Sequence, residues 1–160
     1  MSPDLDVRPY RPADRERVLT LHERAIRAAG TPPEKLPDTS DLDDIEAAYP
    51  DAGGAFLVGE FEGEIVAIGG LVPVADAPDE PGRTAELKRM RVAPDHQGRG
   101  FGGALLGALE DAARDRSFDQ LVLDTAERQG SAPFYRSRGY RETGRRQWRE
   151  FELIAFEKRL

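Results

Sequence analysis

Apolar residues recur along the chain with two periods, and the longer period predicts two substantial helices. In residues 12–29 and 100–116 an apolar side chain returns every three or four positions, as on a helix with one buried face. The apolar face of the first helix consists of Val18, Leu21, His22, Ala25 and Ile26. The apolar face of the second consists of Phe101, Ala104, Leu105, Ala108, Leu109 and Ala112. We expect Glu110, Asp111 and Arg114 of the second helix to face water.

Shorter apolar segments, bounded by turn residues, predict strands. We place strands at residues 5–8, 55–60, 65–72, 85–92, 121–123, 140–143 and 148–157. The segment 121–123 is apolar throughout, so we expect this strand to be buried on both faces. Two short helices complete the pattern, one at 41–48 with Asp41 as its N-cap and one at 131–138 ended by Gly139.

The order of these elements predicts the fold class. The strand at 85–92, the helix at 100–116 and the strand at 121–123 form a right-handed crossover between two parallel strands. The segments 55–60 and 65–72 form a hairpin. We therefore expect a mixed α/β (α+β) fold with a sheet of six or seven strands and helices on both faces. No repeat or linker divides the chain, so residues 1–160 are expected to form a single domain.

Composition disfavours several classes of function. The formal net charge is −7, whereas a nucleic-acid-binding surface is basic. The chain has no Cys and only two His, which argues against a thiolate nucleophile and against a metal site. We expect His22 to pack in the core and His96 to be structural or solvated. No run of about 18 apolar residues is present, so we expect a cytoplasmic protein without a membrane span.

A glycine cluster at residues 98–103 opens the second long helix. Free backbone N–H groups at a helix N-terminus favour an anion, so this stretch predicts a site for a phosphate-bearing ligand. The cluster reads literally as G-x-G-x-x-G, with Asp124 where a dinucleotide-binding fold keeps its ribose acid. Residues 93–97, however, separate the cluster from its strand, and too little chain follows for the remaining units of that fold. The strand at 85–92 is also amphipathic rather than buried, which disfavours dinucleotide binding.

The same residues contain a second pattern, Gln97-x-x-Gly100-x-Gly102, directly after a strand. A further motif follows downstream, Phe134-Tyr135-Arg136-Ser137-Arg138-Gly139-Tyr140. With these two motifs the chain resembles the GNAT superfamily of acyl-CoA-dependent N-acyltransferases. The resemblance implies a GNAT-like fold and transfer of an acetyl group from acetyl-CoA, as co-substrate and without a metal, to a primary amine in a ternary complex. The implied acceptor is a small molecule or a peptide, no membrane is involved, and a homodimer stays open.

The resemblance also implies which residues bind coenzyme A. Main-chain amides at 97–103 would hold its diphosphate, since glycine lets the backbone approach closely. The pantetheine arm would pair with the main chain between two splayed strands. The expected cofactor-binding residues are Met90, Arg91, Val92, Gln97, Gly98, Arg99, Gly100, Phe101, Gly102, Gly103, Gln129 and Tyr135. Many members have Asn where this chain has Arg128, so we expect Gln129 or Ser131 to substitute. Arg99 is either a phosphate ligand or a solvated loop cation.

Two side chains are the candidate catalysts. Tyr135 matches the family's catalytic Tyr, and its reference pKa of about 10 keeps it protonated to donate to the departing sulfur. The alternative is a Tyr that only packs beside the cofactor. Glu86 begins the strand at 85–92, where some members place the base that deprotonates the amine, and the alternative is a half-exposed sheet residue. The main-chain N–H of Met90 is the expected oxyanion donor.

The acceptor is the least determined feature. In this family the loops at 31–40 and 73–84 would border its pocket, and here both are acidic and proline-rich. They either attract a cationic amine or form the solvated surface of an acidic protein. Small amines, amino acids, antibiotics and protein N-termini all stay open. A non-catalytic acyl-CoA-binding regulatory module is the alternative from a different class, which the presence of Tyr135 and Glu86 disfavours.

Overall fold

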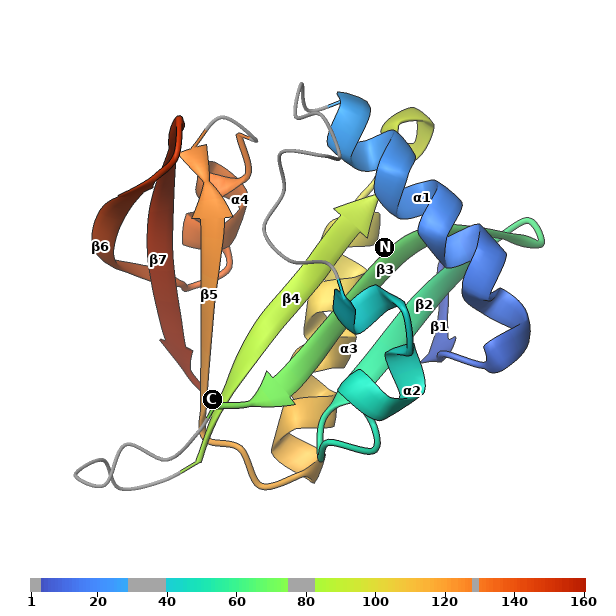
Figure 1. Ribbon diagram of the computed structural model, residues 1–160, viewed down its shortest axis with the longest axis horizontal. Coiled ribbons are helices and arrows are strands. Elements are labelled where there is room, and N and C mark those ends of the chain that lie inside the picture. Colours follow the sequence, from blue (N-terminus) through green and yellow to red (C-terminus); the bar gives the residue numbers. More distant parts are fainter. Residues whose placement is uncertain (1–3, 29–39, 75–82, 128–129) are drawn as a thin grey trace.

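The computed structural model describes residues 4–28, 40–74, 83–127 and 130–160, and it contains a seven-stranded sheet with helices on both faces (Figure 1). The strands are β1 (Asp6–Pro9), β2 (Ala55–Phe61), β3 (Glu64–Pro73), β4 (Thr84–Val92), β5 (Gln120–Ala126), β6 (Arg141–Trp148) and β7 (Phe151–Arg159). The helices are α1 (Arg15–Ala28), α2 (Ile45–Ala48), α3 (Phe101–Asp115) and α4 (Ala132–Ser137), with 3₁₀ turns η1 (Pro12–Asp14), η3 (Ser40–Leu42) and η4 (Pro94–His96). The fold class expected from the sequence is confirmed.

The strand order is β1-β2-β3-β4-β5-β7-β6, and the predicted crossover lies at its middle. Among the described strands, β4 and β5 are the one parallel pair of neighbours, and α3 connects them. The other neighbouring strands pair antiparallel. A dinucleotide-binding fold needs a mostly parallel sheet, so this topology rejects that alternative for the glycine cluster.

Two apolar cores lie on opposite faces of the sheet. The helix α3 covers one face, and α1 and α2 cover the other over β2, β3 and β4 (Figure 1). The core under α3 includes Leu57, Leu71, Leu87, Leu105, Leu109 and Leu121. The core under α1 and α2 includes Val18, Leu21, Ile45, Tyr49, Phe56 and Ile68. Because β2 and β3 contribute side chains to both cores, almost all of their side chains are buried.

The strand β5 differs from its prediction. Leu121, Leu123 and Thr125 are buried, but Val122 is half-buried and Asp124 is exposed, so β5 alternates rather than being buried on both faces. The physical reason is visible in Figure 1, where α1 and α2 lie over β2 to β4 and leave the same face of β5 uncovered. This uncovered face of β5 becomes one wall of the cleft described below.

The short helix near residue 45 begins later than expected. Its N-cap is Asp44, whose Oδ1 accepts a hydrogen bond of 3.1 Å from the amide of Ala47, so the prediction of Asp41 as the cap was wrong. Asp41 lies in η3, and its carboxylate accepts hydrogen bonds from Arg89 and Tyr49 instead. The side chain of Asp41, which the local sequence assigned to a helix cap, therefore forms an ion pair with Arg89, a residue distant in the sequence.

Two further residues, Glu110 and Trp148, differ from the sequence prediction. Glu110 of α3 does not face water, because it is buried and accepts hydrogen bonds from the Tyr140 hydroxyl (2.9 Å) and the Lys158 ammonium (2.8 Å). The acid thus ties α3 to β7, which no helical periodicity could reveal. Trp148 ends β6 rather than beginning the last strand, and its ring stacks on Phe151 across the turn at 6.0 Å.

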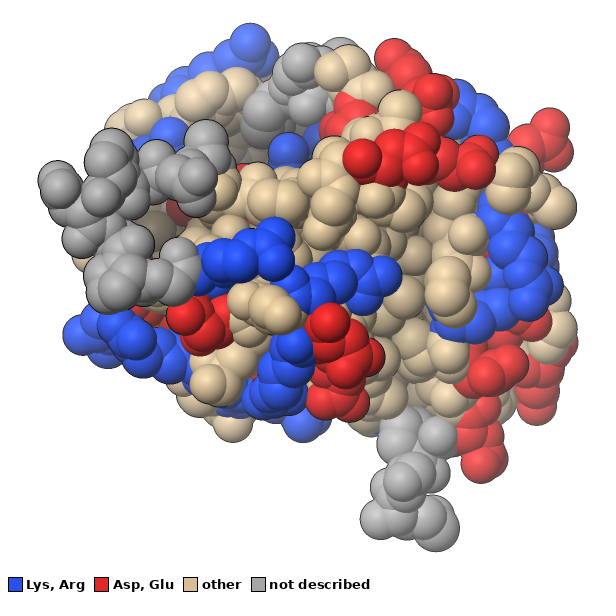
Figure 2. Space-filling model, turned by 90° about the horizontal axis from the view of Figure 1, so that it is seen from below, with Lys and Arg blue, Asp and Glu red and all other residues tan. Residues whose placement is uncertain are grey.

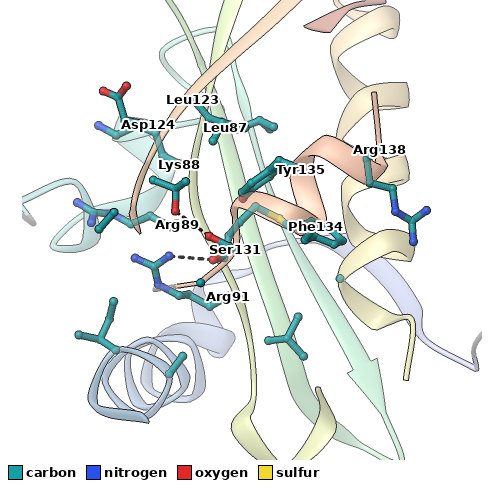
Figure 3. Close-up of a pocket in the computed structure, with 18 of the residues that line it drawn as sticks. Leu87, Lys88, Arg89, Arg91, Leu123, Asp124, Ser131, Phe134, Tyr135 and Arg138 are labelled. Carbon is teal, nitrogen blue, oxygen red and sulfur yellow. Dashed lines mark hydrogen bonds between the residues drawn. The ribbon is translucent and has the colours of Figure 1, made fainter. Parts of the chain in front are cut away.

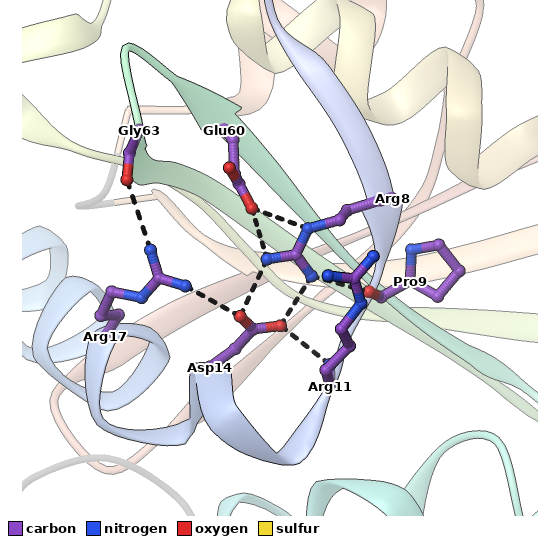
Figure 4. Close-up of polar contacts among 7 residues, drawn as sticks. All are labelled: Arg8, Pro9, Arg11, Asp14, Arg17, Glu60 and Gly63. Carbon is purple, nitrogen blue, oxygen red and sulfur yellow. Dashed lines mark hydrogen bonds and ion pairs between the residues drawn. The ribbon is translucent and has the colours of Figure 1, made fainter.

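A buried carboxylate joins β1, β2 and the start of α1 (Figure 4). Asp14 is 1% exposed and accepts two hydrogen bonds from the Arg8 guanidinium, at 2.8 and 2.9 Å. It also accepts from the amide of Arg11 (2.8 Å) and from Arg17 (3.0 Å), while Arg8 donates to Glu60. The hydrogen bonds from Arg8 lower the pKa of Asp14 to about 2. Folding therefore favours the ionised form of this acid.

We expect Asp14→Asn to lower the free energy of unfolding by about 2 kcal/mol at pH 7, because the hydrogen bonds from Arg8 and Arg11 lose their charged acceptor while Glu60 stays as a counter-charge to Arg8. Urea denaturation measures this change. Since the folded-state pKa lies below the ordinary value of 3.8, the stabilisation is present above pH 3.8 and is lost as the pH falls towards 2. The control is Asp111→Asn, an exposed acid paired with Arg114 on α3, with an expected change below about 0.5 kcal/mol. Equal effects of the two substitutions would contradict the assignment.

Candidate active site

The two parallel strands at the centre of the sheet part after a short paired region. Their register pairs Thr84 with Gln120, Ala85 with Leu121 and Glu86 with Val122. Residues 87–92 of β4 and 123–126 of β5 have no partner across the gap, although each strand keeps its other neighbour. Unpaired main-chain groups along a strand edge are a template for an extended ligand. The splay expected from the family resemblance is therefore present.

A β-bulge in β4 decides which side chains face this gap. The register with β3 shifts between Ile68 and Gly70, and Arg89 has a positive φ of 60°. The extra residue lets Leu87 and Met90 both pack on the α3 side, where a Cβ on Gly69 would meet the Met90 sulfur at 2.9 Å. The charged residues Glu86, Lys88, Arg89 and Arg91 consequently share the other face of β4. A strict two-residue alternation would have divided them between the faces.

A cleft of about 680 Å³ follows the gap along its length. Figure 3 shows part of its lining, with Arg89 and Arg91 on one side of β4 and Phe134, Tyr135 and Arg138 on the other. The glycine cluster and the start of α3, which follow β4, line one side of the cleft, and Arg146 and Trp148 of β6 line the side of β5. Its size suits a ligand of the size of a cofactor or drug.

The glycine cluster supplies backbone donors on the first of these sides. Gly98 and Gly100 have φ values of 78° and 83°, a left-handed conformation that residues with a Cβ rarely adopt. Gly100 is the N-cap of α3 and has no side chain to accept from the first amides of the helix. The geometry of these amides is compatible with the anion site that the sequence predicts. Gln97 lines the same side and donates from its side-chain amide to the carbonyl of Val92 (3.2 Å).

Arg138, at the end of α4, is a functional candidate that the sequence prediction missed. A Cβ on Gly103 would lie 2.0 Å from its Nη2, so a side chain at residue 103 would displace the guanidinium from its place beside the first turn of α3. Its Cζ lies 5.7 Å from the centre of the Phe134 ring, and no described acid pairs with it. A cation at the positive end of a helix is unfavourable unless an anion lies between them. The available signal was the spacing of Arg138, one helical turn after Tyr135.

Tyr135 and Glu86 both line the cleft. The Tyr135 ring is packed against Phe134, Tyr140 and Phe156, and burial raises the pKa of its hydroxyl to about 12. Burial also raises the pKa of Glu86 above its usual range. The phenol thus stays protonated and the carboxyl has a strengthened basicity, which are the properties required of an acid and a base in acyl transfer.

The charge of the cleft differs from that of the chain. Its described lining contains the acids Glu86 and Asp124 and the bases Lys88, Arg89, Arg91, Arg138 and Arg146. Asp41 pairs with Arg89 (2.6 Å), and Asp124 pairs with Arg146 (2.7 Å). On the surface seen in Figure 2, acidic and basic side chains are interspersed. The cleft is therefore a local basic region on an acidic protein, suited to anionic ligands.

Most of the residues predicted to bind a cofactor meet in this cleft. Those that line it are Met90, Arg91, Val92, Gln97, Gly98, Gly100, Phe101, Gly102, Gly103 and Tyr135. Arg99 does not line it, and its Cζ lies 5.8 Å from the centre of the Phe61 ring. Gln129 and Arg128 lie outside the described residues, as does most of the loops at 31–40 and 73–84. Ser131 lines the cleft, and its hydroxyl is 2.7 Å from that of Thr125.

Neither histidine forms a hydrogen bond or ion pair with Tyr135 or Glu86 among the described residues. His22 is 5% exposed with both ring nitrogens unpaired, and burial lowers its pKa to about 4. His96 stacks against Phe101 at 6.2 Å and lines the cleft. No group of three or more His, Asp or Glu side chains in the described part of the chain could hold a metal ion. None of the described helices has the length and hydrophobicity needed to span a membrane.

Comparison with known proteins gives one consistent result. Residues 19–140 match the model of the acetyltransferase (GNAT) family. N-acetyltransferase 8F1 of Rattus norvegicus is 35% identical over 108 residues, which cover 67% of this chain and 48% of that protein. The chain thus spans about half the length of the curated relatives it matches.

Solved structures share the fold over almost the whole chain. An acetyltransferase from Streptococcus agalactiae has a TM-score of 0.81 at 22% identity, covering 98% of both chains. YncA of Salmonella typhimurium, solved with acetyl-CoA, has a TM-score of 0.74 at 21% identity, covering 97% of this chain and 93% of its own. The names of the curated relatives are those of enzymes, which disfavours a non-catalytic binding module.

Proposed function

The chain belongs to the acetyltransferase (GNAT) family, and from this premise we propose that it transfers the acetyl group of acetyl-CoA to a primary amine by direct attack in a ternary complex. The observation that carries the proposal is the cleft that joins the free amides of the glycine cluster to Tyr135 and Glu86 through the gap between β4 and β5. The absence of Cys from the sequence also favours direct transfer over a Cys-bound acyl intermediate.

The residues of the cleft fit coenzyme A. The amides of residues 98–103 bind its diphosphate, and Arg138 adds a cation at the same helix end. The main chain of β4 binds the pantetheine arm. The carbonyls of Met90 and Val92 accept hydrogen bonds from the side chains of Arg91 and Gln97. These local bonds can be exchanged for bonds to an extended ligand.

The protein groups then have separate roles in acyl transfer. Acetyl-CoA supplies the acetyl group as a thioester. Glu86 accepts a proton from the ammonium group of the acceptor, directly or through water, so that its nitrogen can form the new C–N bond. The amide of Met90 donates to the acetyl oxygen as negative charge develops there. Tyr135 donates its proton to the sulfur as the C–S bond breaks, and the nitrogen, now bonded to the acetyl carbon, releases its second proton, which restores the Tyr135 phenol. The products are free coenzyme A and an N-acetylated amine.

Tyr135→Phe is expected to lower kcat by about 100-fold, because the departing sulfur loses its proton donor. The test measures thiol release from acetyl-CoA with a panel of primary amines. Since the pKa of Tyr135 is raised to about 12, its ionisation should not reduce kcat below about pH 11. Glu86→Gln should remove the acidic limb of the pH profile, whose apparent pKa is expected above 4.5 because burial favours the protonated carboxyl.

Tyr140→Phe is the matched control. Tyr140 does not line the cleft, and its hydroxyl donates a hydrogen bond to Glu110. Its kcat should stay within about twofold of the wild type. If Tyr135→Phe were as active as the wild type at every pH, the acid role would be wrong. If acetyl-CoA bound but no amine supported turnover, the transferase proposal would fail.

Arg138→Gln is expected to raise the KM for acetyl-CoA about tenfold with kcat nearly unchanged, because a charge-assisted bond to phosphate is lost. Gly103→Ala should act in the same direction, since its Cβ displaces the guanidinium of Arg138. Arg114→Gln removes an equal charge from the outer side of α3 and serves as the control. Steady-state kinetics with varied acetyl-CoA measures all three, and an unchanged KM in Arg138→Gln would remove Arg138 from the phosphate site.

A further inference from the structure

We propose that the acceptor is an amino acid and that the guanidinium of Arg91 binds its carboxylate. The inference rests on the acyltransferase function proposed above and names the class of substrate for the same cleft. It depends on the isolation of Arg91, on the face of β4 from which it projects, and on the position of Glu86 along that face.

Arg91 is the cation of the cleft whose charge is least satisfied by the protein. Its Nη1 donates to the carbonyl of the adjacent Met90 (2.9 Å), while its Nε is buried and has no hydrogen-bond partner. None of the described acids lies within ion-pair distance of it. The neighbouring cations differ, because Asp41 accepts two hydrogen bonds from Arg89 and Asp124 pairs with Arg146. Asp41 and Asp124 are thus paired with other arginines, Glu86 forms no ion pair with Arg91, and Arg91 is left without a counter-charge among the described residues.

A buried guanidinium without a counter-charge destabilises the folded protein. Burial, together with the charge of Arg89, lowers the pKa of Arg91 to about 10, and Arg91 in turn disfavours a proton on His22. A planar group with several unsatisfied donors matches a carboxylate, which accepts two parallel hydrogen bonds. The unfavourable charge is therefore explained by a ligand that supplies the missing anion.

The position of Arg91 separates this anion from the phosphates of the cofactor. Arg91 projects from β4 towards α1, where Ala25 and Ile26 line the cleft, whereas the glycine cluster opens α3 on the opposite face of the sheet (Figures 1 and 3). In Figure 3 Arg138 lies on the far side of β4 from Arg91. The two unpaired arginines therefore serve two anions, with Arg138 at the diphosphate and Arg91 at the acceptor.

Glu86 and Arg91 occupy the same face of β4, and their spacing fits one bifunctional molecule. With one residue absorbed by the bulge, their Cα atoms are about 13 Å apart along the strand. Neither group is among the charges that shift the pKa of the other, so the two side chains lie apart, and an amino acid that binds both must be long enough to span the gap between them. One ligand can thus place its amine at Glu86 and its carboxylate at Arg91.

The experiment compares amino acids with their own primary amides as acceptors. Glycine, L-phenylalanine, β-alanine and 4-aminobutyrate are each tested against the corresponding amide by thiol release at saturating acetyl-CoA. The amine of an α-amino acid amide is the less basic one and is more often unprotonated at neutral pH, so any preference for the acid must come from recognition. We expect the wild type to favour the best free acid by about tenfold or more in kcat/KM.

Variants of Arg91 identify the residue responsible. Arg91→Gln should bring the ratio of kcat/KM for the free acid to kcat/KM for the amide close to one, while the KM for acetyl-CoA stays within about twofold of the wild type. Arg91→Lys should keep part of the preference for the acid. Arg141→Gln, an exposed cation paired with Glu157 outside the cleft, is the control for net charge and should keep the wild-type ratio. Arg91→Met should raise the melting temperature of the ligand-free protein by about 3 °C, because an unpaired buried charge is removed.

Three results would overturn the inference: amides as good as acids in the wild type, an Arg91→Gln ratio equal to that of the wild type, or a lower melting temperature for Arg91→Met, which would indicate a structural role. In the first two cases turnover persists, so the acyltransferase function would stand. If no amine were acetylated, calorimetry with N-acetyl-L-phenylalanine and its amide in the presence of coenzyme A decides the matter. Binding of the acid alone, lost in Arg91→Gln, supports the carboxylate site, and equal or absent binding rejects it.

Discussion

The separation of β4 from β5 is the constraint on which the active site depends. Three residue pairs hold the two parallel strands together at one end, and the strands then part so that main-chain groups of each face an open gap. A sheet does not leave such groups unpaired in its middle without cost, because buried amides and carbonyls need partners. Here the carbonyls of Met90 and Val92 accept from the side chains of Arg91 and Gln97. The gap is thus a built feature of the fold rather than a defect in pairing.

The bulge at Arg89 completes this arrangement. It holds a non-glycine residue at a positive φ, which is unfavourable by about 1–2 kcal/mol. The ion pair with Asp41 of η3 holds the Arg89 side chain in this conformation. In return, the apolar side chains of Leu87 and Met90 reach the core under α3, and the charged side chains of β4 all reach the opposite face. One irregular residue therefore gives the strand a hydrophobic side and a chemically active side.

Sequence periodicity predicted the elements well where packing is local. The helix α3 and the hairpin of β2 and β3 follow from their apolar spacing, and the glycine cluster follows from its place between a strand and a helix. Periodicity failed where a side chain pairs with a residue that is distant in the sequence. Glu110 is buried because Tyr140 and Lys158, in the C-terminal part of the chain, donate hydrogen bonds to it. Asp41 pairs with Arg89 and does not cap a helix.

The site was predictable in its motifs but not in its electrostatics. The residues that carry the family resemblance, such as Gln97, Gly100 and Tyr135, do line the cleft. Arg138 was missed because its place in the cleft depends on its contact with Gly103 in another element. The isolation of Arg91 was equally hidden, since nothing in the sequence shows that Asp41 and Asp124 pair with other arginines. Which charges stay unpaired is a property of the assembled fold.

Hydrogen exchange of the backbone amides with and without coenzyme A tests the central claim most directly. The account predicts that coenzyme A slows exchange of amides in residues 87–92 and 98–103 well beyond the uniform slowing that ligand binding gives the whole fold. Amides of β1 and β2, which lie away from the cleft, should show the uniform effect alone. Protection confined to other elements, or no added protection along the open edge of β4 when coenzyme A is bound, would contradict it.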